Sequence, residues 1–193
     1  MKLIPLLLTL GMLAVSGWAE DAKPEPYSAE LVKKAEAGDT NAQSNLRRCY
    51  YNGQGGRQDY KEAVKWHKKS AEQGVSAAQY ALGDYYAQGQ GVPQDYKKAV
   101  GWYTKSANQN NPRAQWKLAD CYYYGQGVPQ DYKEAVKLYR KSDTRQSQYK
   151  LGLCYQNGNG VPKDENEALD WYRKSADQNY EDAKKALERL KSK

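Results

Sequence analysis

Phenylalanine is missing from this 193-residue sequence, although tyrosine occurs 18 times and tryptophan five times. The tyrosine hydroxyl needs a hydrogen-bond partner or water, so this composition favours half-buried aromatic positions over a dry core. Histidine occurs once, at His67, without a second His or a Cys at ligand spacing, which excludes a histidine-based metal site. We expect neither a metal nor a cofactor.

Long apolar runs are also missing, apart from the first segment of the chain. Lys2 precedes an apolar stretch at residues 3–15 that is short for a bilayer span, and small residues at Gly17 and Ala19 suit a signal peptidase. We therefore predict a signal peptide at residues 1–19, with an uncleaved membrane anchor as the alternative. No Cys follows closely, which argues against a lipoprotein anchor. The mature chain is expected to be periplasmic or secreted, with no integral membrane segment.

Acidic residues are outnumbered by basic ones, and the formal net charge is +7. Such a balance can indicate nucleic acid or an anionic surface as the partner. Export argues against nucleic acid, because the product leaves the cytoplasm. The length fits one domain or a short repeat array.

Internal repetition is the strongest signal that the sequence does contain. Four segments align without gaps from Ala42, Ala78, Ala114 and Ser147, at steps of 36, 36 and 33 residues. Repetition at this period is typical of a solenoid in which each unit stacks on the next. Six columns match: Leu46, Leu82, Leu118 and Leu151; Tyr50, Tyr86, Tyr122 and Tyr155; Gly53, Gly89, Gly125 and Gly158; Gly55, Gly91, Gly127 and Gly160; Asp59, Asp95, Asp131 and Asp164; Ala63, Ala99, Ala135 and Ala168.

Each segment predicts a helix, a loop and a second helix. Ala42 and Leu46 fall on one face of the first helix, which Gly53 ends because glycine tolerates a left-handed backbone. Asp59 is expected to cap the second helix, and Glu62 three residues later to complete a capping box.

The ends of the array predict half-repeat caps. Residues 28–38 resemble a lone second helix, and residues 183–190 a lone first helix whose charged side chains can cover the last apolar face. We divide the chain into a signal peptide at 1–19, a flexible linker at 20–27 and an all-α solenoid at 28–193, expected to be a monomer. The repeats span residues 42–77, 78–113, 114–146 and 147–182.

The motif that these columns form is most complete in the second segment, at residues 78–107. It reads A-x-x-x-L-G-x-x-Y-x-x-G-x-G-V-P-x-D-Y-x-x-A-x-x-W-Y-x-K-S-A and resembles the Sel1-like repeat over residues 28–190. The resemblance implies a right-handed α/α solenoid related to tetratricopeptide repeats, with first helices lining a concave face. It also implies an adaptor or regulator of other proteins. Exported members include immunity proteins that neutralise toxins, and a Cys-rich subgroup is linked to β-lactam binding or hydrolysis.

The sequence departs from the motif in a few places. Arg47 and Ala119 stand where the motif has Gly, and the third segment is three residues shorter after Ser142. A tighter or kinked stack is expected at that point. The Cys-rich subgroup has paired cysteines inside each repeat and this chain does not, which weakens the β-lactam interpretation.

The three cysteines share one column, at Cys49, Cys121 and Cys154. Equivalent residues of stacked helices lie about 8–10 Å apart, beyond the ~7 Å Cα limit of an unstrained disulfide. We interpret them as semi-buried small apolar side chains, with a Cys121–Cys154 bridge as the alternative. His67 occupies a tyrosine column and is expected to be an exposed or half-packed aromatic substitute.

The repeated polar columns offer no catalytic constellation. A nucleophile needs one adjacent base and one oxyanion hole, not four equivalent copies. The Gly-x-Gly pairs lack the strand that precedes a phosphate loop. We therefore predict a protein that is not an enzyme. The recurring serines are Ser70, Ser106, Ser142 and Ser175.

One stripe of the first helices carries the candidate partner-binding residues. Positions three, seven, ten and eleven of each first helix lie on this stripe, off the core face. Tyr and Trp are effective interface anchors, and two Asp among them favour a partner segment that carries Lys or Arg. The alternative is that these aromatics fill space between neighbouring helices. The selected residues are Arg48, Tyr51, Tyr80, Asp84, Trp116, Asp120, Tyr123, Tyr124 and Tyr149.

The sequence thus predicts a protein–protein interaction module, in its sharpest form an immunity-type inhibitor of a secreted toxin. One alternative is an enzyme that binds or hydrolyses β-lactams or cell-wall peptide. The other is envelope binding through a ladder of lysines on the second helices, unless that ladder is only a solvated convex face. The ladder consists of Lys69, Lys105, Lys141 and Lys174.

Overall fold

The structure, a computed structural model, describes residues 27–54 and 57–191, which form ten α-helices joined by short loops. The predicted signal peptide lies outside the described residues, as does the predicted linker apart from Tyr27. Of the helices described, none combines the length and the hydropathy that crossing a bilayer requires. The helices are α1 (Ala29–Glu36), α2 (Thr40–Asn52), α3 (Tyr60–Glu72), α4 (Ser76–Gln88), α5 (Tyr96–Asn108), α6 (Pro112–Tyr124), α7 (Tyr132–Ser142), α8 (Arg145–Asn157), α9 (Glu165–Asp177) and α10 (Glu181–Lys191).

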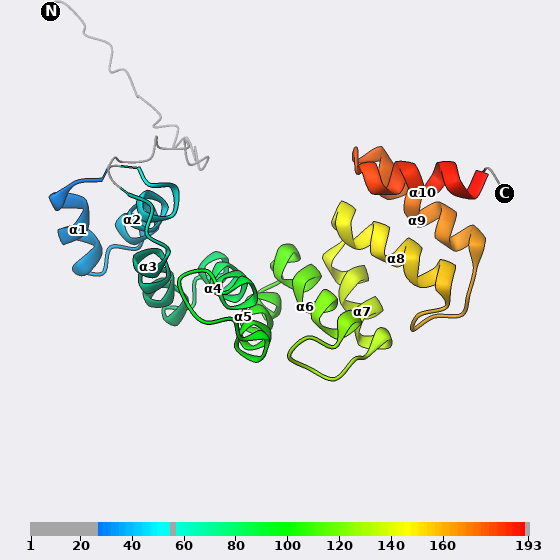
Figure 1. Ribbon diagram of the computed structural model, residues 1–193, viewed down its shortest axis with the longest axis horizontal. Coiled ribbons are helices and arrows are strands. Elements are labelled where there is room, and N and C mark those ends of the chain that lie inside the picture. Colours follow the sequence, from blue (N-terminus) through cyan, green and yellow to red (C-terminus); the bar gives the residue numbers. More distant parts are fainter. Residues whose placement is uncertain (1–26, 55–56, 192–193) are drawn as a thin grey trace, which may run out of the picture.

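The helices form hairpins that stack side by side into an arc. α2 packs with α3, α4 with α5, α6 with α7 and α8 with α9, and the second helix of each hairpin contacts the next hairpin. Figure 1 shows the arc from α1 at one end to α10 at the other, with both ends curving to the same side. α1 packs on α2 and α10 on α9, so a single helix covers each end of the stack. The predicted all-α solenoid is confirmed.

Each loop is shaped by glycine, as the second repeat illustrates. Gly89 follows α4 in the left-handed conformation, at a φ of 69°, and its N–H donates to the Tyr85 carbonyl. Gly91 lies against the first turn of α3, where an added Cβ would stand 2.5 Å from the Tyr60 carbonyl oxygen. The second glycine of the loop is therefore a contact between repeats, because a larger residue would clash there.

The predicted helix caps are present, but the capping box is not complete. Asp59 Oδ1 accepts hydrogen bonds from the backbone N–H groups of Lys61 and Glu62, at 2.9 and 3.1 Å. The Asp59 N–H donates to the Tyr50 carbonyl instead of to Glu62, and the Glu62 carboxylate pairs with Lys65 Nζ at 3.3 Å. The box prediction is wrong here because the loop, which returns to the end of α2, already occupies the cap N–H.

The core follows the predicted columns, with one correction. The Leu column of the first helices and the Ala column of the second helices are buried at every repeat. Tyr103, Tyr139 and Tyr172 are fully buried as well, although the missing phenylalanine predicted half-buried aromatic positions. That prediction is wrong for these rings because their hydroxyls reach acceptors on the neighbouring first helix.

A glutamine column that the sequence did not single out joins each of the first three repeats to the helix before it. Gln79 Nε2 on α4 donates to the carbonyl of Ala71, in the last turn of α3, at 3.1 Å. Gln43 and Gln115 make the same bond at the equivalent positions, at 3.1 and 3.3 Å. These bonds satisfy carbonyls that the helix ends would otherwise leave unpaired.

The shortened segment forms a compact turn between α7 and α8. Asp143 adopts a left-handed backbone with a φ of 47°, and Thr144 caps α8 through a bond to the Ser147 N–H. Gln148 finds no equivalent alanine carbonyl in this turn, so its Nε2 donates to Asp143 Oδ1 at 2.9 Å. The deletion is thus accommodated by replacing a backbone acceptor with a carboxylate.

Candidate functional site

Two adjoining pockets on the first helices contain five of the nine predicted partner-binding residues. The pocket between repeats one and two has a volume of about 350 Å³ and is lined by Arg48, Tyr51 and Asp84 among others. The pocket between repeats two and three has a volume of about 320 Å³ and is lined by Asp84, Asp120 and Tyr124 among others. Asp84 belongs to both, so the two pockets form one continuous surface, which we call the inner groove.

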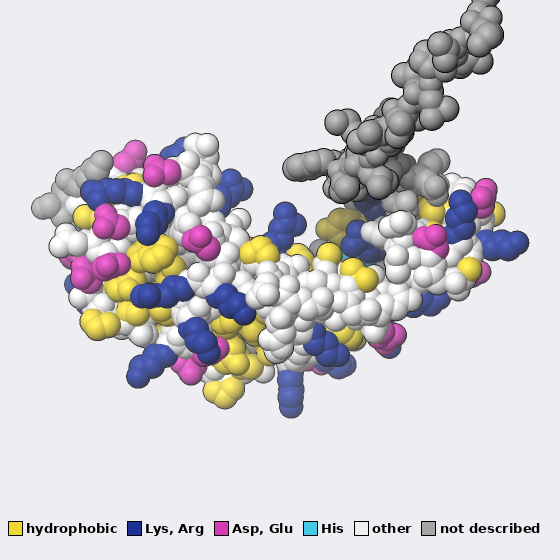
Figure 2. All heavy atoms as spheres, turned by 180° about the vertical axis from the view of Figure 1, so that it is seen from behind, with side chains coloured by type: hydrophobic (Ala, Val, Ile, Leu, Met, Phe, Trp, Pro, Cys, Tyr) yellow, Lys and Arg dark blue, Asp and Glu magenta, His cyan; other side chains and the backbone are white. Residues whose placement is uncertain are grey.

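The other predicted residues lie elsewhere on the first helices. Tyr80 and Trp116 line a wider pocket of about 670 Å³, together with the turn at Asp143. Tyr123 packs edge-on against Tyr124, with ring centroids 4.9 Å apart. Tyr149 packs against Tyr172 and Tyr180, with centroid separations of 5.7 and 5.4 Å. Figure 2 shows the molecule hollowed between its two ends, with hydrophobic and basic side chains at the rim of the hollow.

Exposure differs strongly among these aromatic side chains. Tyr51 and Tyr124 are 41% and 52% exposed, so both are accessible to a partner. Trp116, Tyr123 and Tyr149 are half-buried. The half-buried rings therefore fill space between helices, as the alternative interpretation expects, whereas Tyr51 and Tyr124 remain accessible.

The two inner-groove aspartates are held by buried tyrosines of the second helices. Tyr103 on α5 donates from its hydroxyl to Asp84 Oδ1 at 2.6 Å, and Tyr139 on α7 donates to Asp120 Oδ1 at 2.5 Å. Burial raises the pKa of Asp120, and the bond from Tyr139 opposes that rise. Burial also raises the pKa of Tyr103 and Tyr139, so both hydroxyls stay protonated and donate.

Two lysines that were not selected from the sequence lie beside these carboxylates. Lys117 lines the pocket between repeats two and three. Lys150 Nζ donates to the Tyr124 hydroxyl at 2.5 Å and lies 4.9 Å from the centroid of that ring. Burial acts to lower the pKa of Lys150, but Tyr124 and Asp120 outweigh it and raise the pKa above its usual value. Both lysines occupy position four of a first helix, which the predicted stripe of positions three, seven, ten and eleven did not include.

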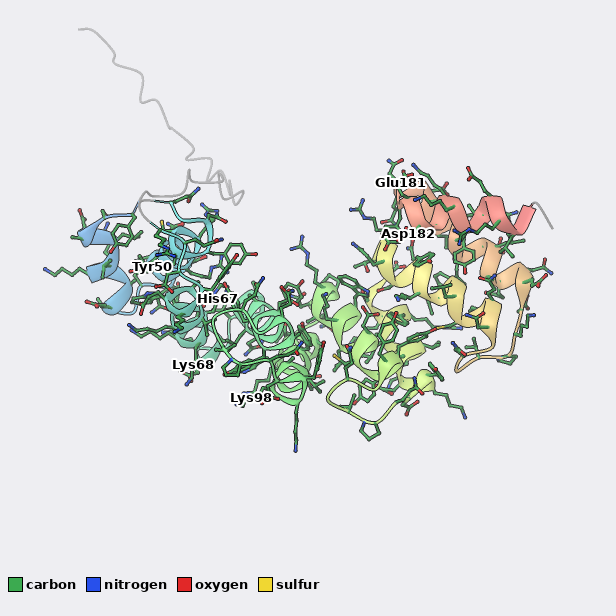
Figure 3. All side chains as sticks on the ribbon, in the orientation of Figure 1. Tyr50, His67, Lys68, Lys98, Glu181 and Asp182 are labelled. Atoms are coloured by element: carbon green, nitrogen blue, oxygen red, sulfur yellow. The ribbon has the colours of Figure 1, made fainter. Side chains whose placement is uncertain are left out.

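His67 is buried, and the prediction of an exposed or half-packed side chain is wrong. Only 3% of the residue is exposed, and Figure 3 shows it on the side of α3 that faces α4. Its Nδ1 lies 2.9 Å from the Ala63 carbonyl and must donate there, so Nε2 accepts from Arg47 Nη1 at 3.0 Å. Burial, and then the Arg47 charge, lower the pKa of His67 to about 3.

The cysteine column is apolar in character. Cys49, Cys121 and Cys154 are all buried, and Cys121 and Cys154 are free thiols, so the alternative of a bridge between them is wrong. Burial raises the pKa of Cys121 and of Cys154 to about 12. A thiol with so high a pKa is a poor nucleophile, because the thiolate is the reactive form.

The serine column is structural in the last three repeats. Ser106 Oγ donates to the Ser76 carbonyl at 2.8 Å, and Ser142 Oγ donates to the Pro112 carbonyl at 2.8 Å. Ser175 Oγ makes the equivalent bond to Arg145, at 2.6 Å. Each bond ties the end of a second helix to the start of its own first helix, which accounts for the recurrence of serine there.

Three of the four lysines in the ladder of the second helices pack on tryptophan rings. Lys69, Lys105 and Lys174 each place Nζ 4.2 Å from the centroid of the tryptophan three residues earlier. This cation–π contact orients the ammonium groups along the outer face. In the third repeat Leu138 takes the place of the tryptophan, and Lys141 is simply exposed.

Stacked helical hairpins of this kind define a helical-repeat protein, an α-solenoid. Comparison with known families makes this specific. The Sel1 repeat pattern matches residues 40–75, 76–111, 112–142 and 145–180, and the chain therefore belongs to the Sel1 repeat family, whose fold mediates protein–protein interaction. The matched segments begin at the same intervals as the columns seen in the sequence.

Solved structures show the same family. A protective antigen with an SLR fold, present in uropathogenic Escherichia coli strains, is 39% identical with a TM-score of 0.76 over 80% of this chain. The chain spans only 34% of that antigen. A Sel1 repeat protein from Oxalobacter formigenes is 32% identical with a TM-score of 0.72, and the match covers 82% of this chain and 72% of that one.

A more distant likeness shows the fold alone. An immunity protein from Pseudomonas aeruginosa is 22% identical with a TM-score of 0.51, over 79% of this chain and 58% of that one. No curated protein matches the sequence.

Proposed function

We propose that this chain is an exported interaction module that binds a partner protein in its inner groove. The observation that carries the proposal is the pair Asp84 and Asp120, two carboxylates fixed in position by buried tyrosine donors on successive repeats. A fixed carboxylate loses little freedom on binding, which favours recognition of a cationic side chain. The partner segment would therefore carry Lys or Arg where it meets these repeats.

The exposed aromatics beside the carboxylates support the same proposal. Tyr124 is half exposed and lies at the edge of the pocket that contains Asp120. A tyrosine ring offers a large contact area at a low cost in rotamer entropy, and the exposed part of this ring would contact the partner. Charge selection by Asp120 and contact area from Tyr124 would act together.

Export is part of the proposal and rests on the first residues of the sequence. The charged start, the short apolar stretch and the small residues before position 20 are those of a signal peptide. The related E. coli chain is a protective antigen, and export of this chain agrees with that description. An immunity-type inhibitor of a secreted toxin is the sharpest form of the proposal, and one protein of the same fold is named an immunity protein.

Affinity capture from native envelope extract tests the proposal. The wild type is compared with the double variant Asp120→Asn/Tyr124→Ala, in which the amide oxygen can still accept the Tyr139 bond. A matched control, Lys105→Ala/Lys174→Ala, alters the outer face instead. We expect the partner to be lost from the groove variant and retained by the control.

Two other results of the capture experiment would contradict binding in the inner groove. Recovery that is unchanged in the groove variant but lost in the control, and that fades with added salt, would replace the groove by the lysine face as the binding surface. Equal recovery by all three proteins would remove both surfaces.

A further inference from the structure

The pocket between repeats one and two is electrostatically different from its neighbour. Arg47 and Arg48 of α2 line it from one side, and Asp84 and Tyr85 of α4 from the other. His67 of α3 lies at its wall, and its pKa of about 3 leaves it neutral at physiological pH. Two guanidinium groups against one carboxylate leave one positive charge in the pocket.

Two hydrogen-bond donors in this pocket have no partner among the residues that the structure describes. The Tyr85 hydroxyl is buried, with 3% of the residue exposed, and makes no hydrogen bond. Arg48 Nε is likewise buried and unpaired. A buried donor without an acceptor is costly, so both groups suit an acceptor that arrives from outside.

Two of the acceptors that line this pocket are already engaged. His67 directs its one free nitrogen lone pair to Arg47, and Asp84 Oδ1 is taken by Tyr103 on the side of the next repeat. Arg47 is bonded to His67 and to Ser44, which fixes its guanidinium at the pocket wall. Arg48 Nε and the Tyr85 hydroxyl are the donors in this pocket that an anionic oxygen from outside would satisfy.

All three donors are peculiar to this junction of the solenoid. The columns that hold Arg47, Arg48 and Tyr85 contain Gly or Ala, Asp or Leu, and Cys in the repeats that follow. The repeat architecture therefore does not require them. A different role at this single junction accounts for their presence.

We infer that this pocket binds a carboxylate of the partner, either an acidic side chain or the end of a chain, between the Arg48 guanidinium and the Tyr85 hydroxyl. The inference rests on the proposed function, since it describes the partner of the same groove. The single positive charge of the pocket matches a monoanion, and Asp84 repels a doubly charged phosphate. A partner would then present an acidic group at repeats one and two and a basic group at repeats two and three.

Three peptides test the inference on the purified protein, with the NMR signals of His67 as the readout, because the chain has one histidine. The probes are acetyl-Ala-Glu-Ala-amide, acetyl-Ala-Ala-Ala with a free carboxylate, and acetyl-Ala-Ala-Ala-amide. We expect a saturable shift of the His67 signals with one or both carboxylate peptides and not with the amide. A shift with the glutamate peptide indicates that the ligand is an acidic side chain. A shift with the peptide that ends in a free carboxylate indicates that the ligand is a chain terminus.

Variants assign the binding to the named donors. Arg48→Gln is expected to weaken binding about tenfold or more, and Tyr85→Phe about fivefold without lowering thermal stability. Arg113→Gln removes an exposed charge from another pocket and is the matched control, with unchanged affinity.

Three results would overturn the inference. They are equal shifts with all three peptides, unchanged affinity in Arg48→Gln, or tighter binding of inorganic phosphate than of the peptides. Because this titration needs no partner, it can succeed when the capture experiment fails, and it can fail when the capture experiment succeeds. The two proposals are therefore tested separately.

Discussion

Repeat one has the same helical hairpin as repeats two to four, but different side chains form the contact between its two helices. In repeats two and four, Gly83 and Gly152 lie under Tyr103 and Tyr172, and a Cβ on either glycine would come within about 2.5 Å of the ring. In repeat one, Arg47 replaces the glycine, and the smaller ring of His67 replaces the tyrosine.

Two columns of the repeat therefore change together, for a steric reason. A full tyrosine needs a small residue beneath it, whereas a larger side chain is accepted where the ring is smaller. The exchange also changes the chemistry of the surface. A tyrosine donor holds an aspartate in the groove, while a histidine acceptor holds an arginine there. Ala119 under Tyr139 is an intermediate solution in repeat three.

The largest effect is expected from placing the arginine of repeat one beneath the tyrosine of repeat two. Gly83→Arg should destabilise the protein by about 3 kcal/mol, because a Cβ there already clashes with Tyr103. The double variant Gly83→Arg/Tyr103→His reproduces the pair of repeat one and should recover part of the loss. Urea unfolding measures both. A double variant less stable than the single one would contradict the steric coupling.

A smaller loss is expected when an aspartate of the groove is removed. Asp120→Ala leaves the buried Tyr139 hydroxyl without an acceptor and should cost about 2 kcal/mol. Adding Tyr139→Phe removes the orphaned hydroxyl and should return much of that stability. If the two substitutions were simply additive in denaturant unfolding, the bond would not be the reason for the pairing.

The comparison also predicts a pH response that belongs to repeat one. His67 has a pKa of about 3 in the folded chain, below its value of about 6.5 when unfolded. The unfolded state therefore binds more protons as the pH falls from about 6.5 towards 3, and stability falls with it. At pH 5.5 the loss should be about 1.4 kcal/mol relative to pH 8. His67→Gln should lack this component in a series of unfolding measurements across pH, and an unchanged slope would refute the assignment.

The smallest predicted effect is a gain. Tyr85→Phe removes a buried hydroxyl that has no partner within the described residues, and should stabilise the unliganded protein by about 1 kcal/mol. The matched change Tyr103→Phe removes a hydroxyl that is bonded to Asp84 and should not stabilise. Thermal unfolding of the two variants side by side would reveal whether Tyr85 is held ready for a ligand.

Much of the fold could be predicted from the repeat columns because apolar period and glycine position are local properties of the chain. Leu46 on the first helix and Asp59 at the start of the second are examples that the structure confirms. Polar contacts between helices were harder to predict. The Gln79 bond to Ala71 and the Arg47 bond to His67 depend on which side chains meet across the stack.

The sequence predicted which helix face carries the candidate site, but it did not predict how exposed each side chain on that face is. The stripe led to Asp84 and Asp120, and the structure places both in the inner groove. It did not indicate that tyrosines from the second helix hold them, nor that Lys150 lies beside Tyr124. A helical period assigns a residue to a face, while the depth of that face depends on the neighbouring hairpin.

The glutamine bonds have a consequence for how the array responds to change. Each of them joins a hairpin only to the helix before it, so the coupling between units is of the nearest-neighbour kind. A unit that is exchanged or duplicated disturbs two junctions and leaves the others as they were. Selection could therefore alter one junction while the distant ones stay unchanged, and could lengthen the array to match a longer partner.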